Sequence, residues 1–197
     1  MYEKLSEQLK KDGRFCLWKY EERNGRMTKV PYQTNGKRAS SADKNTFSDF
    51  RMIIDAMDGY DGIGMGAFDD FCMVDIDHCV SGGKLTQMAE DIVEKMDSYT
   101  EISPSGRGVR IVCKASYLSY DTDRYYINNQ KLGLEIYAAG VTRKFCTLTG
   151  KVIRNRGIEE QSAELGTILE TYMLRPISKK KNRMHDVPGS YLSDDCA

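Results

Sequence analysis

An apolar run that ends in two closely spaced acids, Phe71 to Asp77, constrains the fold of this chain more than any other segment. Strand side chains alternate with a period of two, so we expect Asp75 and Asp77 on one face of a strand and Cys72, Val74 and Ile76 on the other. At a rise of ~3.3 Å per residue, the two carboxylates lie about 7 Å apart and can bind one or two divalent cations. The alternative is a strand that simply ends in solvent.

Composition limits the classes of protein that this chain can belong to. Its 197 residues suffice for one domain, and 40% hydrophobic with 29% charged residues is typical of a soluble globular protein. No apolar run approaches the ~20 residues that cross a bilayer, and the N-terminus lacks the pattern of a secretory signal. The six cysteines show no CxxC spacing, which favours reduced, packed thiols over disulfides or a zinc site. These features predict a cytoplasmic protein without a membrane partner.

The formal net charge is zero, but the charges are unevenly distributed. Residues 14–51 carry nine Lys and Arg against four Asp and Glu, whereas residues 55–101 carry two against twelve. Residues 143–156 and 175–183 each contain five basic residues. An acidic centre between basic flanks fits a metal site bordered by a phosphate-binding surface. Solvated faces of an ordinary protein are the alternative.

Periodicity and turn signals predict more strands than helices, and thus an α+β protein with a mixed or antiparallel sheet. Asn24-Gly25 is typical of a tight hairpin. The strand that carries the acids is expected to form a hairpin with the strand before it, and the last two strands are expected to pair with each other. We expect helices over 2–11, 46–57, 85–96 and 165–172, strands over 15–22, 27–32, 62–68, 71–77, 99–103, 108–114, 134–138 and 144–149, and a polar basic tail from residue 178.

Two further segments carry candidate chemistry. Ser103 to Arg110 forms a turn between two strands, where glycines can expose backbone N–H groups to an anion and arginines can bind a phosphate. Such turns are also common without a function. Glu135 interrupts an apolar strand, and a buried acid needs a partner. That partner is either a cation shared with Asp75 and Asp77 or a salt bridge to a nearby basic residue, Arg143 or Lys144.

The order of an Asp-x-Asp pair, a Ser/Gly turn and a strand acid resembles the three motifs of the archaeo-eukaryotic primase superfamily. It is more similar still to the primase-polymerase domains of phages and plasmids. The similar phrases are Glu101-Ile-Ser-Pro-Ser-Gly-Arg-Gly108, then Glu135-Ile-Tyr137, then a basic residue and Phe145-Cys-Thr-Leu-Thr149-Gly150. The resemblance covers roughly residues 14 to 173. It implies a primase-like core with an RRM-like sheet flanked by helices.

The resemblance also implies roles for individual residues. Asp75, Asp77 and Glu135 would hold two Mg²⁺ or Mn²⁺ ions, and Tyr137 would either pack or lie under the base or sugar. The family's second motif usually ends in a histidine, where this chain has Arg110, which can bind a phosphate but cannot transfer protons near neutral pH. The remaining candidates are Ser105, Gly106, Arg107, Arg110 and Arg143 for the nucleoside triphosphate, and Lys29, Lys37, Arg38 and Lys144 for the nucleic acid.

The function implied is template-directed synthesis of nucleic acid from NTPs or dNTPs on a DNA template, in the replication of a phage, plasmid or integrated element. Residues 1–175 would form the catalytic domain and residues 176–197 a basic tail. A replicative helicase would be a separate chain or absent. Two alternatives remain open, a non-catalytic module that binds single-stranded nucleic acid and a metal-dependent nuclease.

Overall fold

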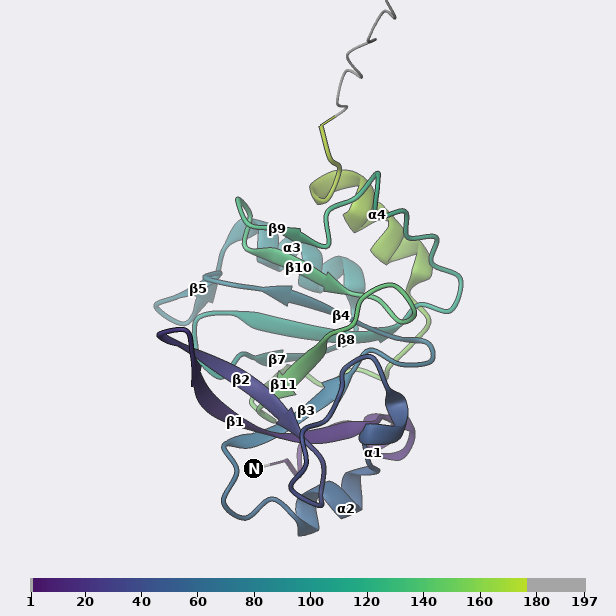
Figure 1. Ribbon diagram of the computed structural model, residues 1–197. Coiled ribbons are helices and arrows are strands. Elements are labelled where there is room, and N and C mark those ends of the chain that lie inside the picture. The colour runs from purple at the N-terminus through teal and green to yellow at the C-terminus, as the bar shows by residue number, and fades with distance from the viewer. Residues whose placement is uncertain (1, 177–197) are drawn as a thin grey trace, which may run out of the picture.

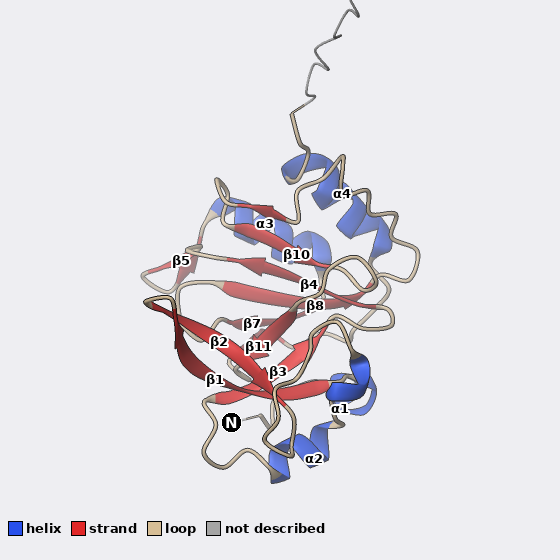
Figure 2. Cartoon of the chain, in the orientation of Figure 1, coloured by secondary structure: helices blue, strands red, loops and turns tan. Residues whose placement is uncertain are grey.

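The computed structural model describes residues 2–176, which form two main antiparallel sheets and four α-helices (Figure 1). The six-stranded sheet, which we call the large sheet, has the strand order β12-β7-β8-β4-β10-β9. The small sheet has the order β11-β3-β1-β2, and β5 and β6 form a separate ribbon. Strands dominate over helices in Figure 2, and the protein is α+β with antiparallel sheets.

The bounds of the elements are as follows. The helices are α1 (Glu7–Asp12), α2 (Phe50–Asp55), α3 (Gln87–Met96) and α4 (Ser162–Tyr172). The strands are β1 (Phe15–Arg23), β2 (Arg26–Tyr32), β3 (Gly62–Gly66), β4 (Phe71–Ile76), β5 (Val80–Ser81), β6 (Lys84–Leu85), β7 (Tyr99–Ile102), β8 (Val109–Lys114), β9 (Asn128–Asn129), β10 (Leu134–Tyr137), β11 (Phe145–Leu148) and β12 (Val152–Arg154).

The two faces of the large sheet bury different cores, and β4 shows why. Its residues Cys72, Val74 and Ile76 pack with apolar residues of α3 and α4 in one core. Its residue Met73 belongs to a second core, formed with the small sheet and the two N-terminal helices. The alternation expected along this strand is therefore confirmed, and Asp75, two residues after Met73, lies on the face toward the small sheet.

Several local predictions are confirmed. The hairpin of β1 and β2 closes through Arg23 opposite Arg26, and both residues of the turn, Asn24 and Gly25, have positive φ, at 52° and 74°. The hairpin of β7 and β8 and the helix α3 are also present, as predicted. No helix within residues 2–176 is long and apolar enough to span a bilayer. The five cysteines in the described residues are buried and free. Cys196 and the predicted basic tail from residue 178 lie outside the described residues.

Two predicted pairings are wrong, because the strands involved belong to different sheets. β3 pairs with β1 and β11 and does not form a hairpin with β4. A side chain at Gly64 would come within 2.7 Å of the Phe145 ring, so the glycine allows β11 to lie against β3. β10 and β11 do not pair with each other either, because β10 lies between β4 and β9.

Two helices begin later than predicted. α2 begins at Phe50, where the Asp49 carboxylate caps it by accepting a hydrogen bond from Met52 N–H at 2.9 Å, and Thr46 ends a preceding 3₁₀ turn. α1 begins at Glu7 rather than near residue 2.

Gly133, just before β10, lies against the end of β4. Its N–Cα torsion φ is +62°, and a Cβ there would meet the carbonyl oxygen of Asp77 at 2.9 Å. Its own carbonyl accepts a hydrogen bond from Asp77 N–H at 2.8 Å. The glycine therefore permits the close approach that fixes the backbone of Asp77.

We expect Gly133→Ala to destabilise the fold more than Gly140→Ala. Both glycines have positive φ, +62° and +72°, so both variants bear the left-handed penalty of roughly 1–2 kcal/mol. Open space surrounds Gly140, so only the first variant also forces a contact with Asp77. Chemical denaturation of the two variants measures the difference. Equal losses would show that the contact with Asp77 costs nothing.

Candidate active site

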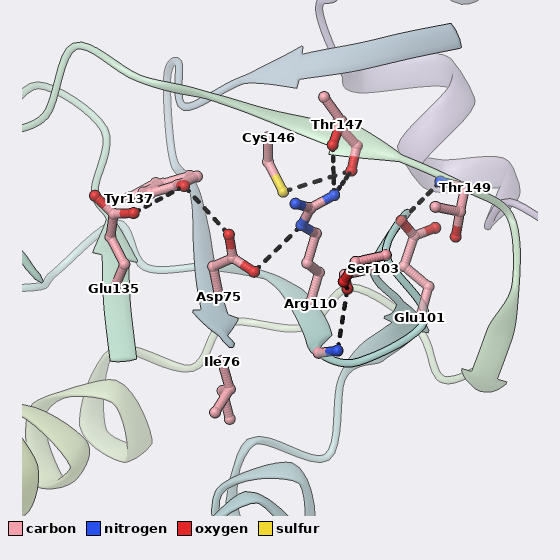
Figure 3. Close-up of polar contacts among 12 residues, drawn as sticks. Asp75, Ile76, Glu101, Ser103, Arg110, Glu135, Tyr137, Cys146, Thr147 and Thr149 are labelled. Carbon is pink, nitrogen blue, oxygen red and sulfur yellow. Dashed lines mark hydrogen bonds and ion pairs between the residues drawn. The ribbon is translucent and has the colours of Figure 1, made fainter. Parts of the chain in front are cut away.

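A row of charged residues crosses four strands of the large sheet. Directly opposite one another in the register are Glu101 on β7, Arg110 on β8, Asp75 on β4 and Glu135 on β10. Residues that face each other across antiparallel strands share one face of the sheet. Glu135 therefore lies beside Asp75, although sixty residues of sequence separate them (Figure 3).

The hydroxyl of Tyr137 connects the two acids of this row. It donates a hydrogen bond toward Asp75 Oδ2 at 3.3 Å and toward Glu135 Oε2 at 3.1 Å (Figure 3). Burial raises the pKa of Tyr137, and the nearby charge of Asp75 raises it further. The side chain therefore stays protonated and holds the two carboxylates close to one atom. Sequence alone could not distinguish this role from packing or from a contact with a base.

Arg110 joins the acid row to the small sheet. Its Nε donates to Asp75 Oδ1 at 3.3 Å, and its Nη1 donates to the hydroxyl of Thr147 at 2.5 Å and to the Thr147 carbonyl. Only 6% of Arg110 is exposed. A fully charged arginine in this position is stabilised by a carboxylate and by two oxygens of β11.

Asp77 follows β4 and completes the acidic group. Its carboxyl is exposed, yet loss of solvent around it raises its pKa, and the charges of Asp75 and Glu135 raise that pKa further. Asp77 is therefore near enough to the other two acids for their charges to raise its pKa. Within residues 2–176, however, no group of three or more His, Cys, Asp or Glu side chains is arranged as a metal-binding cluster.

Two lysines supply positive charge at the acids. Lys144 forms an ion pair with Glu135, which is the salt bridge that the sequence left open, and its Nζ lies 5.6 Å from the centre of the Tyr137 ring. Lys29, on β2, reaches Thr147 Oγ1 at 3.4 Å. Burial and the nearby Arg110 lower the pKa of Lys29, whereas Asp75 and Asp77 oppose this shift. Lys29, on β2, and Lys144, just before β11, therefore border the same acidic centre.

Most backbone N–H groups of the turn between β7 and β8 donate hydrogen bonds to acceptors within the same turn. Gly108 N–H donates to the Ser103 hydroxyl at 3.1 Å, and Arg107 N–H donates to the Ser105 hydroxyl at 3.3 Å. Gly106 N–H donates to the Ser103 carbonyl at 2.9 Å. The Ser105 hydroxyl also lies 3.1 Å from the Ser103 hydroxyl, and the exposed side chains of Ser105 and Arg107 form the outer surface of the turn.

The other predicted contact residues lie on loops. Arg38 pairs with Glu21 at 2.7 Å on the β1–β2 hairpin, and Lys37 is exposed beside it. Arg143 is also exposed, and its carbonyl accepts a hydrogen bond from the Ser41 hydroxyl at 2.8 Å. The structure thus brings Lys29, Arg110 and Lys144 to the acids by direct contact or charge, and gives Lys37 and Arg38 no such link.

Two residues of the site were not assigned a role from the sequence. Glu101 is fully buried and accepts hydrogen bonds from Thr149 N–H at 2.8 Å, from Gly150 N–H at 3.0 Å and from the Tyr99 hydroxyl at 2.9 Å. The Thr147 hydroxyl oxygen accepts hydrogen bonds from Arg110 Nη1 and Lys29 Nζ. The rule that singled out Glu135, an acid within an apolar strand, also applies to Glu101, whereas Thr147 has no such signal.

The fold and this site define an α+β protein in which carboxylates from two adjacent strands lie at one tyrosine hydroxyl, with three basic residues, Lys29, Arg110 and Lys144, close by. No protein-family model matches the sequence. The chain is 28% identical over 208 aligned residues to the DNA primase-polymerase of Nitratiruptor phage NrS-1. The alignment covers 91% of this chain and 28% of the phage protein, so the chain spans little more than a quarter of that relative's length. This similarity supports a relationship to primase-polymerases.

Proposed function

We propose that this chain is the catalytic domain of a primase-polymerase, formed by residues 1–175, which makes phosphodiester bonds from nucleoside triphosphates on a DNA template. The observation that carries the proposal is the register that places Glu135 opposite Asp75, with both carboxylates at the Tyr137 hydroxyl. The similarity to a phage DNA primase-polymerase supports it independently.

The donor chemistry of the acids fits a magnesium or manganese site. Asp75, Asp77 and Glu135 offer only carboxylate oxygens, the ligands that these ions prefer. Bound there, the ions would lower the pKa of an attacking 3′-hydroxyl and neutralise a triphosphate. In the structure Arg110 and Lys144 supply this positive charge, so metal binding must compete with two ion pairs. The described residues contain no preformed three-acid cluster, so metal binding would require Asp75 and Glu135 to leave these ion pairs.

The basic residues around the acids would orient the triphosphate. If Asp75 and Glu135 held metal, Arg110 and Lys144 would be free to direct their charge toward phosphate oxygens, and Arg110 could do so bidentately. Thr147 would still accept a hydrogen bond from Nη1 of Arg110 and so orient its guanidinium. Ser105 and Arg107, on the exposed turn between β7 and β8, would extend the phosphate-binding surface, as would Arg143.

A single gel separates this function from the two alternatives. A labelled primer–template is incubated with NTPs or dNTPs and with Mg²⁺ or Mn²⁺ in turn. A polymerase extends the labelled strand, and a nuclease shortens it without triphosphates. A binding module does neither and still retains single strands in EDTA. Absence of extension under every condition would contradict the proposal.

Arg110 gives a prediction that is specific to the triphosphate. We expect Arg110→Lys to weaken triphosphate binding more than single-strand binding, because lysine keeps the charge but cannot hold Asp75, Thr147 and a phosphate together. Lysine is preferable to alanine here, since breaking a buried ion pair costs about 3–5 kcal/mol of stability. Titration calorimetry with a nucleotide and anisotropy with labelled DNA compare the two affinities. Equal losses would remove Arg110 from the triphosphate site.

A further inference from the structure

The hairpin of β1 and β2 extends beyond the small sheet beside the acid row. β3 pairs only with residues Phe15 to Trp18 of β1, so residues 19–29 form a two-stranded ribbon with its turn at Asn24-Gly25. The Asp61 carboxylate accepts the Tyr20 N–H at 2.7 Å, just where the pairing with β3 ends. Figure 1 shows the ribbon curving from β3 toward the large sheet.

One face of this ribbon carries an exposed aromatic ring and an exposed apolar side chain. In the register, Tyr20 lies opposite Lys29, and Met27, opposite Glu22, is on the same face two pairs nearer the turn. Tyr20 is 47% exposed and Met27 is 62% exposed, whereas the neighbouring Trp18 is only 4% exposed. The Tyr20 ring meets the Trp18 ring edge-on, with the centroids 5.1 Å apart. Packing against Trp18 therefore fixes the orientation of Tyr20 while much of its surface remains accessible.

A continuous series of contacts connects this face to the acids. Lys29 Nζ lies 5.6 Å above the Trp18 ring and 3.4 Å from Thr147 Oγ1. Thr147 in turn binds Arg110, which pairs with Asp75 at 3.3 Å. The exposed aromatic surface is therefore anchored to the same groups as the candidate metal ligands. A ligand on this face would lie beside the site of chemistry.

The ribbon as a whole carries more basic than acidic residues. Residues 19–29 contain Lys19, Arg23, Arg26 and Lys29 against Glu21 and Glu22. In the register, Lys29 and Glu22 share the face of Tyr20 and Met27. The other charged residues lie on the opposite face, where Glu21 pairs with Arg23 and Arg38 and accepts a hydrogen bond from Tyr32. An exposed aromatic ring beside a lysine, on a hairpin with net positive charge, is a feature of surfaces that bind single-stranded nucleic acid through base stacking.

We propose that Tyr20 and Met27 form a stacking surface for an unpaired base of the template strand, with Lys29 next to the adjoining phosphate. The inference rests on the proposed function, because template-directed synthesis requires an unpaired strand beside Asp75. Stacking needs the exposed face of a base, so this surface discriminates single strands from duplex. It does not read sequence, because every base has such a face.

The test measures binding without catalysis. Fluorescence anisotropy of a labelled single-stranded oligodeoxynucleotide, in EDTA and without triphosphates, is compared for wild type, Tyr20→Ala and Tyr20→Phe. Tyr117→Ala is the matched control, because Tyr117 is 84% exposed on the loop between β8 and β9, and Met52→Ala serves in the same way for Met27→Ala. We expect Tyr20→Ala to weaken binding roughly five- to 100-fold, as loss of one stacked base does, and Tyr20→Phe to bind like wild type. Neither control should weaken binding.

Distinct results overturn this inference and the proposed function. The stacking surface is excluded if Tyr20→Ala binds single strands as wild type does, if it loses no more than Tyr117→Ala, or if blunt duplex shows the same loss. A higher KM for the nucleotide with unchanged single-strand affinity would also exclude it, because the ring would then contact the incoming base. If Tyr20-dependent binding is found but the primer-extension gel shows no synthesis, the polymerase proposal fails and the single-strand surface stands.

Discussion

Asp75→Asn should abolish metal-dependent nucleotide incorporation while the protein stays folded. The variant loses one charge of the proposed metal site, and charge stabilisation by a bound metal is worth several kcal/mol in the transition state. Since each 1.36 kcal/mol is tenfold in rate, we expect a fall of about 1,000-fold or more. Primer extension under single-turnover conditions measures the rate, and thermal melting measures the fold.

Asparagine is the informative replacement because of the contacts of Asp75. Its amide oxygen can still accept from Arg110, and the Tyr137 hydroxyl can still bond to the side chain. Asp75→Ala would instead leave the Arg110 charge buried without its carboxylate, at about 3–5 kcal/mol of stability. The control is Asp70→Asn, which removes an Asp–Lys pair of 3.0 Å just before the start of the same strand. Full activity of a folded Asp75→Asn protein would contradict the metal site.

Glu101→Ala should cause a large loss of stability without touching the proposed metal ligands. It removes the acceptor of three buried donors, the N–H groups of Thr149 and Gly150 and the Tyr99 hydroxyl. Each buried donor left unpaired costs about 1–3 kcal/mol, so we expect a loss of several kcal/mol in chemical denaturation.

Glu160→Ala is the matched control for this change. Glu160 also accepts three hydrogen bonds, from Ser116 N–H and from the N–H and hydroxyl of Ser162, but its side chain is exposed. Water can replace the lost acceptor there, and the cost should be small. Similar losses in the two variants would show that burial of Glu101 is not what makes its hydrogen bonds important.

Glu101 also predicts a pH dependence of stability. Burial raises its pKa despite the hydrogen bonds from Tyr99, Thr149 and Gly150 that oppose the shift. A carboxyl whose pKa is higher in the folded state binds its proton more tightly there, so it contributes stability below the unfolded pKa of about 4.3. That contribution is lost as the pH rises through the folded pKa. The stability of wild type relative to Glu101→Gln should therefore decrease as the pH rises. An increase would show that folding lowers the pKa of Glu101 instead of raising it.

The predictions that succeeded from sequence depended on neighbouring residues. Asn24-Gly25 specified a two-residue turn because both positions tolerate positive φ. The alternation in β4 specified which side chains enter the core and which face Asp75 shares. The relationship to primase-polymerases also followed from short motifs and their order, and the similarity to the phage protein supports it.

The predictions that failed concerned partners distant in sequence. β3 and β4 are adjacent in the chain, and so were expected to pair, but a glycine in β3 accommodates β11, and β4 lies between β8 and β10. The contact of Glu135 with the Tyr137 hydroxyl is local, because the two residues are two positions apart on one strand. The choice between a shared cation and Lys144 as the partner of Glu135 could not be made from the sequence. Glu101 escaped notice because its partners lie at the end of another strand.

The amino-acid sequence was enough to predict the local elements, the face on which Asp75 lies and the kinds of side chain available for chemistry, because these follow from backbone preferences and from periods of two and 3.6 residues. The folded structure was needed to see that Glu135 lies opposite Asp75, that Arg110 and Lys144 pair with the acids, and that the β1–β2 hairpin lies beside them. Those arrangements depend on which strands pair, and pairing is chosen by burial and close packing over the whole chain rather than by any one segment.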